Sequence, residues 1–256
     1  MRQEKNAGTH LIGENNNMSN HRRGFVPEDE KDFSDTSIVL LQKAQQELLY
    51  LVERGYPIKN ASTFVGNHHM LSERQRLAIV RASGSSQDLT LRKKKELTVE
   101  NLGQRVVIDG FNTIITLEVA LSQGTLLSCM DGAIRDLAGL RGTYRLIDQT
   151  DQAICLLGDQ LKELNLSEVI IYLDAPVSNT GRLKSRIFEL LGSYPFHLKV
   201  ELINQVDVLL QNEEQVVTSD SIIMNKCKSW FNLNRVILEH RNVNYVDLSN
   251  GNSLRN

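Results

Sequence analysis

Three short apolar runs after residue 100 each end in an aspartate, and this arrangement restricts the fold more than any other feature of the sequence. The runs span Arg105–Asp109, Glu168–Asp174 and Gln215–Asp220, and two further runs of β-branched character span Phe196–Ile203 and Asn242–Leu248. Strands that alternate with helices predict βαβ crossovers and a mostly parallel sheet covered on both faces, which is an α/β fold. The helical patterns between the runs lie at about 111–121, 126–138, 149–164, 181–191, 204–212 and 221–239.

The strand-terminal aspartates are expected to meet. The carboxyl ends of parallel strands form one edge of the sheet, so Asp109, Asp174 and Asp220 would share it, and Asp207 lies in a short helical segment that would project over the same edge. Two carboxylates about 4 Å apart repel by roughly 4 kcal/mol at an effective dielectric near 20. Either a raised pKa on one carboxyl group or a divalent cation compensates for this, and we favour Mg²⁺ or Mn²⁺. Each aspartate taken singly would also suit a helix or turn cap.

The same residues carry a family resemblance. Val106–Asn112, which reads VVIDGFN, resembles the opening strand of PIN-like nucleases, especially their NYN branch, in which a DGxN motif closes the first strand. Val208–Leu210 and Val216–Ser221 are similar to the later acid-bearing segments of that superfamily. The resemblance covers about residues 104–250 and implies a PIN-like three-layer α/β/α domain.

The resemblance also implies a chemistry. In that family the matching acids hold one or two divalent metals that activate water for RNA phosphodiester hydrolysis. Asp109, Asp207 and Asp220 would then be ligands, directly or through water, and Asn112 would orient the first acid or a water on the metal. We add Asp174 to the catalytic set from its position at the end of a strand.

Two other functions fit the same edge. The acidic doublet that NYN nucleases commonly carry before the last acid is absent, which would suit a catalytically inactive PIN-like RNA-binding module. A nucleotide-processing phosphohydrolase could use the same acids on a small phosphate.

Composition divides the chain into four parts. Residues 1–32 contain five asparagines and few apolar residues, which predicts a disordered tail. A helical module follows at 33–84, with one helix from Asp35 to near Arg54 and another that begins at Ser72. Residues 85–103 are expected to form a flexible basic linker, and residues 104–256 the PIN-like domain. The helical module, through the stretches 54–57, 65–71 and 74–76, also resembles a small uncharacterised prokaryotic domain found in front of PIN-like domains.

Several basic residues are candidates for binding a phosphate backbone. Arg182, Lys184 and Arg186 stand at a predicted helix N-terminus, where an external anion would relieve their conflict with the helix dipole. Arg74 and Arg81 form a basic stripe on the second helix of the module. In each case a solvated helix face is the alternative.

The interval 131–145 supplies further candidates. Asp131 and Arg135 are four residues apart and would pair on one face of the helix predicted at 126–138. Arg141, between two glycines, would present donors to a phosphate. Because PIN-like folds often take an acid from a helix in this interval, Asp131 and Asp136 are secondary candidates for the metal site.

Two adjacent histidines, His68 and His69, are expected to lie in a loop without a metal. Neighbouring side chains diverge on a regular element, and no further ligand is close in the sequence.

Composition excludes other classes. No apolar run approaches the roughly 20 residues of a membrane span, and no secretory signal opens the chain, so we expect a cytoplasmic protein without a membrane partner. The three cysteines are widely spaced and form no CxxC pair. Neither a P-loop nor a GxSxG elbow is present, and no organic cofactor is expected. The balance of 29 basic to 31 acidic residues leaves an RNA partner open, as it does a homodimer.

Overall fold

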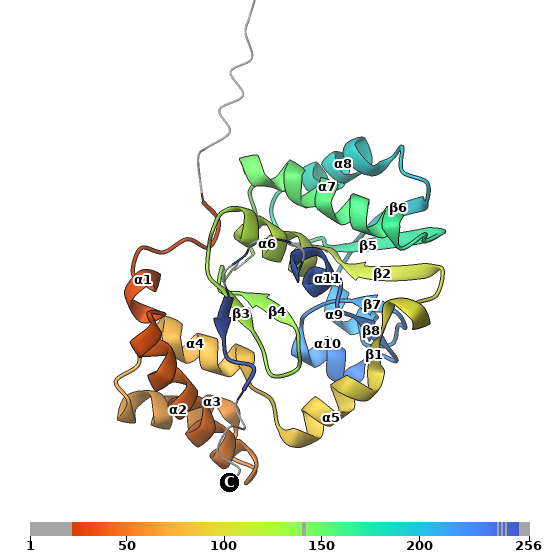
Figure 1. Cartoon of the computed structure of the whole chain (residues 1–256). Helices are drawn as coiled ribbons and strands as arrows, with labels where there is room; N and C mark the ends of the chain where they lie inside the picture. The colour runs from red at the N-terminus through yellow and green to blue at the C-terminus, as the bar shows by residue number, and fades with distance from the viewer. Residues whose placement is uncertain (1–21, 140–141, 240, 242, 244, 251–256) are drawn as a thin grey trace, which may run out of the picture.

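The fold is built on a central sheet of six parallel strands. The computed structural model describes residues 22–139, 142–239, 241, 243 and 245–250. In the described residues the strands follow the order β1-β8-β7-β2-β5-β6 (Figure 1). Their bounds are β1 (Glu96–Leu97), β2 (Arg105–Asp109), β5 (Glu168–Asp174), β6 (His197–Ile203), β7 (Val216–Val217) and β8 (Trp230–Phe231). The parallel α/β fold predicted from the sequence is confirmed.

Alternation along the strands creates two cores, one on each face of the sheet. Val106 and Ile108 of β2 point into the larger core, whereas Val107 between them points into the other. The larger core lies beneath α6 (Gly110–Leu121), α7 (Asp148–Glu163), α8 (Thr180–Leu191) and α11 (Leu233–Glu239). The opposite face is covered by α9 (Val206–Leu210) and α10 (Ser221–Lys226), with α5 (Ser86–Lys95) against α10.

A second, three-stranded sheet replaces the helix predicted at 126–138. Its strands are β4 (Ile134–Asp136), β3 (Leu126–Ser128) and β9 (Tyr245–Asp247), and β3 runs antiparallel to β4 and parallel to β9. A turn at Gly132, with a φ of 82°, reverses the chain between β3 and β4, and the Ala133 amide donates to Asp131 Oδ1 within it. The strand predicted at 242–248 therefore exists as β9 but lies outside the central sheet.

Two other boundaries differ from the prediction. The helical stretch expected at 221–239 is interrupted by β8, which separates α10 from α11. The strand expected at 215–220 ends at Val217, so residues 218–220 form a loop at the sheet edge.

The N-terminal helices pack on the second sheet. They are α1 (Asp29–Asp32), α2 (Asp35–Val52), α3 (Ile58–His68) and α4 (Glu73–Ala82), and Figure 1 shows them grouped beside β3 and β4. α4 begins with the capping box suggested by the sequence: Ser72 Oγ accepts from the Gln75 amide, and Gln75 Oε1 accepts from the Ser72 amide. Leu127 of β3 lies in the core of these helices, while the neighbouring Leu126 lies in the core of the central sheet. The second sheet thus joins the two parts of the chain.

Two segments predicted to lack structure are ordered where they are described. Residues 86–95 form α5 and not a flexible linker, because Ser85 Oγ accepts from the Asp88 amide and the buried Arg92 anchors the helix. The short helical turn η1 (Val99–Asn101) follows. Within the predicted tail, Arg23 is buried in an ion pair with Glu118, and 29–32 form α1. Residues 1–21 lie outside the described residues.

None of the described helices combines the length and the apolar character that a membrane crossing requires.

Candidate active site

The candidate site lies where the order of the strands reverses. From β2 the chain adds β5 and then β6 on one side, and it then returns to place β7 on the other side of β2. α6, which follows β2, and α9, which follows β6, cover opposite faces of the sheet. Such a switch point opens a crevice at the carboxyl ends of the strands, and Asp109 is the last residue of β2 there.

Asp109 is a buried carboxyl group among other acids. Its exposed fraction is 6%, and Thr218 donates its hydroxyl to Asp109 Oδ2 at 2.9 Å. Burial, together with the smaller effect of the charges of Asp220, Asp207 and Asp174, raises the pKa of Asp109 to about 7, although the Thr218 hydrogen bond opposes the change. The four strand-edge aspartates named from the sequence are therefore close enough for their charges to interact.

Asp174 and Asp207 form the outer part of this group. Asp174 ends β5, is partly buried, and accepts from the Val206 amide at 3.3 Å through Oδ1. Burial raises the pKa of Asp174, although this backbone hydrogen bond opposes the effect. Asp207 is exposed on α9, and its pKa is raised by partial desolvation and by the charges of Asp220 and Asp174. Both carboxyl groups thus hold protons more readily than isolated aspartates.

Asp220 is both a helix cap and a member of the acidic group, the two roles that the sequence left open. Its Oδ1 caps α10 by accepting from the Ile222 and Ile223 amides at 2.8 and 3.0 Å. Its own amide donates to Thr218 Oγ1 at 3.0 Å, so the hydroxyl that binds Asp109 is also fixed to Asp220. Asp220 is therefore a helix cap whose charge still acts on Asp109.

Asn112 holds the loop after β7. Its Oδ1 accepts from both the amide and the hydroxyl of Ser219 at 2.8 Å each. The predicted partner of Asn112 was Asp109 or a water on a metal; the structure shows it bound to Ser219. Thr218, which contacts both Asp109 and Asp220, and Ser219, which contacts Asn112, were missed in the sequence, where two hydroxyl residues directly before Asp220 were the available signal.

Gly110 allows α6 to begin against the sheet. A Cβ atom at this position would lie 2.6 Å from Leu173 Cδ2 and 2.8 Å from both Ile171 Cγ2 and the Tyr172 carbonyl oxygen. No L-residue with a side chain fits there without displacing β5. The glycine of the DGFN segment therefore sets the distance between Asp109, at the start of the helix, and the neighbouring strand.

The carboxylates of the acidic edge are spread apart in the structure. No three of the aspartates Asp109, Asp174, Asp207 and Asp220 bring carboxylate oxygens within 4.8 Å of one another. Like charges separate when nothing neutralises them. The charges of these carboxylates therefore interact, but no three of the groups converge on one point.

Asp131 and Asp136 do not join this edge. The Asp131 side chain is 1% exposed and pairs with Arg135 at 2.6 Å and with Arg92 at 2.8 Å, and although burial alone would raise its pKa, the two guanidinium groups hold it below the ordinary value. The predicted pair with Arg135 exists, but across the β3–β4 turn and not on a helix. Asp136 is buried and accepts from the Thr116 hydroxyl and the Ala138 amide. Neither acid is among the main contributors to the raised pKa of Asp109.

Two of the predicted basic contacts are taken by internal partners. Arg74 pairs with Asp29 and donates to the carbonyl oxygens of Leu137 and Gly24, so the expected basic stripe on α4 is partly an internal anchor. Arg186 pairs with Asp151 and Glu189.

The other predicted cations differ in their exposure. Arg182 is exposed in the first turn of α8, and Lys184 is partly exposed with its Nζ 5.9 Å from the Phe188 ring centroid. Arg81 is partly buried on α4. Arg141 lies outside the described residues.

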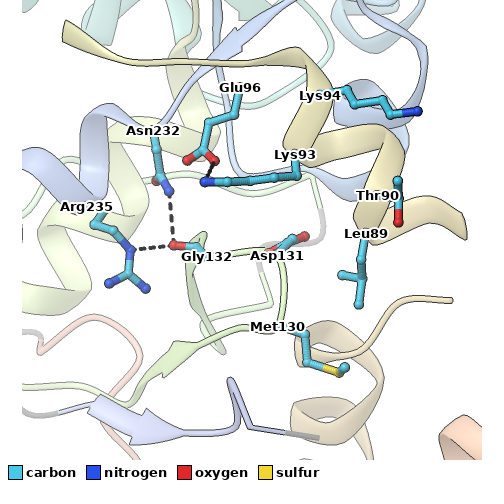
Figure 2. Close-up of a pocket in the computed structure, with 10 residues that line it drawn as sticks. All are labelled: Leu89, Thr90, Lys93, Lys94, Glu96, Met130, Asp131, Gly132, Asn232 and Arg235. Carbon is cyan, nitrogen blue, oxygen red and sulfur yellow. Dashed lines mark hydrogen bonds and ion pairs between the residues drawn. The ribbon is translucent and has the colours of Figure 1, made fainter. Parts of the chain in front are cut away.

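A cavity of about 770 Å³ lies apart from the four aspartates, between α5 and the β3–β4 turn (Figure 2). Lys93 pairs with Glu96 at its rim, and Asn232 and Arg235 both donate to the Gly132 carbonyl oxygen. The cavity contains none of Asp109, Asp174, Asp207 and Asp220.

Comparison with known proteins places this architecture in a family. Residues 99–236, more than half of the chain, match the model of a family described as Domain of unknown function (DUF5616). The chain belongs to this family. Residues 40–95 match a second model, Protein of unknown function (DUF434), which agrees with the expected order of an uncharacterised domain before the α/β domain.

One relative is similar to most of the chain. Uncharacterized protein MJ0935 of Methanocaldococcus jannaschii is 36% identical over 185 residues, which cover 72% of this chain and 88% of that protein. No solved structure matches the chain.

Proposed function

We propose that this protein is a divalent-metal-dependent ribonuclease of PIN-like fold, with Asp109 at the centre of its active site. One observation carries the proposal: a buried carboxyl group with a pKa near 7 stands at a topological switch point, within electrostatic range of three more aspartates. Such an arrangement is costly unless a cation or a proton neutralises it. The likeness of Val106–Asn112 to the first strand of PIN-like nucleases supports phosphodiester hydrolysis as the reaction.

The donor set fits Mg²⁺ or Mn²⁺. Every candidate ligand, namely Asp109, Asp207 and Asp220 with Asp174 beside them, offers a carboxylate oxygen, and hard divalent cations prefer oxygen ligands. Mg²⁺ keeps several waters and binds through one or two carboxylates, so an open group of acids suits it. When bound, the cation supplies charge neutralisation at the scissile phosphate and lowers the pKa of the attacking water.

In this proposal, some residues of the site position the acids and others accept a proton. Thr218 holds the Asp109 carboxylate in place, and the Asn112–Ser219 contact fixes the loop that presents Asp220. Asp174 and Asp207, which are less buried than Asp109 and whose pKa values are also raised, would accept a proton from water.

RNA is the proposed substrate because basic groups flank the same edge. α8 follows β5, so its first turn lies at the carboxyl end of the sheet, and Arg182 is exposed there. Lys184 lies two residues further along the same helix and is partly exposed. Both could contact the phosphate backbone, which supplies most sequence-independent affinity for RNA-binding proteins.

The test is cleavage of a panel of single-stranded and structured RNAs by purified full-length protein, with EDTA, Mg²⁺ or Mn²⁺. We expect metal-dependent cleavage that Asp109→Asn abolishes. Asp159→Asn is the matched control, because Asp159 is an exposed acid near the end of α7 that leads toward the start of β5, on the opposite edge of the sheet.

Three outcomes would overturn the proposal. Equal cleavage by wild type and Asp109→Asn, or with and without EDTA, would exclude this site. RNA binding without metal-dependent cleavage would indicate an inactive binding module. Hydrolysis of free nucleotides alone would indicate a phosphohydrolase.

A further inference from the structure

A second group of possible metal ligands lies in the helical module, remote from the acidic edge in the chain and in the fold. Glu47 is on α2, His68 is the last residue of α3, and His69 follows it. The three side chains offer one carboxylate oxygen and two imidazole nitrogens, all within 4.8 Å of one another. No other such set is found among the residues that the structure describes.

The end of α3 explains why adjacent histidines converge. His69 leaves the helical conformation with φ −91° and ψ 4°, and Met70 then turns the chain with φ 52°. The two imidazole rings consequently meet edge to face, with centroids 4.7 Å apart and an interplanar angle of 80°. The expectation of isolated loop histidines was wrong because the helix ends between them and because the third group comes from α2.

Glu47 and His69 already form the inner half of the site. His69 Nε2 and Glu47 Oε2 are 2.7 Å apart, and the His69 side chain is 6% exposed. Among the described residues Glu47 has no other ion-pair partner. Arg76, a neighbouring cation, is directed to the Leu71 carbonyl and to Asn67 Oδ1.

We propose that Glu47, His68 and His69 bind one Zn²⁺ ion, which ties the end of α3 to α2. Two imidazoles and one carboxylate are a ligand set typical of Zn²⁺ and unlike the all-oxygen set that Mg²⁺ prefers. The exposed His68 leaves the fourth position of the tetrahedron to water.

The required movement is small. Ligand atoms of tetrahedral Zn²⁺ lie about 2.0–2.1 Å from the ion and hence about 3.3 Å from each other. The 2.7 Å contact between His69 and Glu47 would open by about 0.6 Å, and the exposed His68 ring can rotate toward the ion.

The experiment uses full-length protein stripped with EDTA and dialysed into buffer with excess Mg²⁺, which keeps the acidic edge supplied with its own preferred ion. Zn²⁺ binding is measured by calorimetry, and Co²⁺ replaces Zn²⁺ to report the ligands through its visible spectrum. The variants are His68→Ala and Glu47→Gln, of which the second keeps a hydrogen-bond acceptor for His69. His197→Ala is the matched control, since His197 is exposed on β6.

We expect one Zn²⁺ per chain, a tetrahedral Co²⁺ spectrum and a higher thermal midpoint with Zn²⁺ in wild type and in His197→Ala. Each ligand variant should weaken binding at least about tenfold, which is the smallest loss usual even for groups that only support a metal ligand. Unchanged affinity in both ligand variants, an equal loss in His197→Ala, or an octahedral spectrum would overturn the proposal. Because Asp109→Asn leaves these ligands intact, its Zn²⁺ binding should equal that of wild type, whatever the fate of the ribonuclease proposal.

Discussion

Replacing Asp109 by asparagine should stabilise the metal-free protein at neutral and alkaline pH, although the same change is expected to abolish activity. The asparagine side chain has nearly the same shape, and its amide oxygen can still accept from the Thr218 hydroxyl. What it removes is a buried negative charge that faces Asp220, Asp207 and Asp174. A charge in that position opposes folding unless it is neutralised.

The size of the effect follows from the raised pKa. The pKa of Asp109 moves from 3.8 to about 7, roughly three units at 1.36 kcal/mol each, which is about 4 kcal/mol. Because the folded state holds this proton where the unfolded state has lost it, the free energy of unfolding of wild type falls as the pH rises from about 4 to 7. Asp109→Asn has no carboxyl group at this position, so its free energy of unfolding should not fall for this reason as the pH rises. Burying the polar amide also has a cost, which reduces the benefit. We therefore expect the free energy of unfolding of Asp109→Asn to exceed that of wild type by roughly 2–4 kcal/mol at pH 8 and to differ little near pH 4.

Urea unfolding in EDTA measures this directly, with the single tryptophan, the fully buried Trp230, as the fluorescence probe. Wild type, Asp109→Asn and the exposed-acid control Asp159→Asn are compared at pH 4.5 and pH 8. Addition of Mg²⁺ or Mn²⁺ should then stabilise wild type and not the variant, by about 2.7 kcal/mol at a hundredfold excess over the dissociation constant. An Asp109→Asn protein that is less stable than wild type at pH 8, or that differs from it equally at both pH values, would refute the reasoning about the buried charge.

Two further substitutions test the close packing at Gly110 and the buried ion pairs of Asp131. Gly110→Ala should lower the free energy of unfolding by about 1–3 kcal/mol, because the added methyl group collides with Leu173 and the Tyr172 carbonyl. Gly181→Ala is the control and should not lower it, because the space around Gly181 is open. Equal thermal midpoints for the two variants would contradict this prediction. Asp131→Asn should lower the free energy of unfolding, measured with urea, by about 3–5 kcal/mol, because it leaves Arg92 and Arg135 without their buried carboxylate partner. Glu239→Gln, at the more exposed pair with Arg235, is the control and should lower it by under about 1 kcal/mol. A similarly small loss for Asp131→Asn would contradict the prediction.

Local signals were sufficient where one segment settled its own conformation. The strands 105–109 and 168–174 were predicted with the bounds found in the structure, because unbroken β-branched runs suit a strand buried on both faces. The start of α4 was equally clear, since Ser72 and Gln75 satisfy each other's amides within a single turn. In both cases the deciding contacts are close in the sequence.

Local signals failed where distant partners decided. The spacing of Asp131 and Arg135 indicated a helix, yet the same pair forms across a β-turn, and β3 is held by β4 and by β9 more than a hundred residues away. The segment 86–95 was predicted to be part of a linker because its composition is polar. In the structure it is a helix, anchored by contacts of Arg92 with Asp131 and Asn225 that are distant in the sequence. His68 and His69 seemed unaccompanied in sequence because Glu47 reaches them only through the packing of α2 on α3.

The sequence by itself determined the parallel α/β class and the presence of Asp109 and Asp174 at strand ends, because side-chain alternation and the direction of parallel strands follow from local pattern. It also placed Asp220 at the same edge, although this residue lies in the loop three residues after β7. Tertiary structure alone decided which acids interact, that Asp131 serves an internal ion pair, and that Thr218 and Ser219 fix the edge. The reason is physical: a carboxyl group's pKa and partners depend on desolvation and on charges brought close by folding, and neither quantity is encoded in the neighbouring residues.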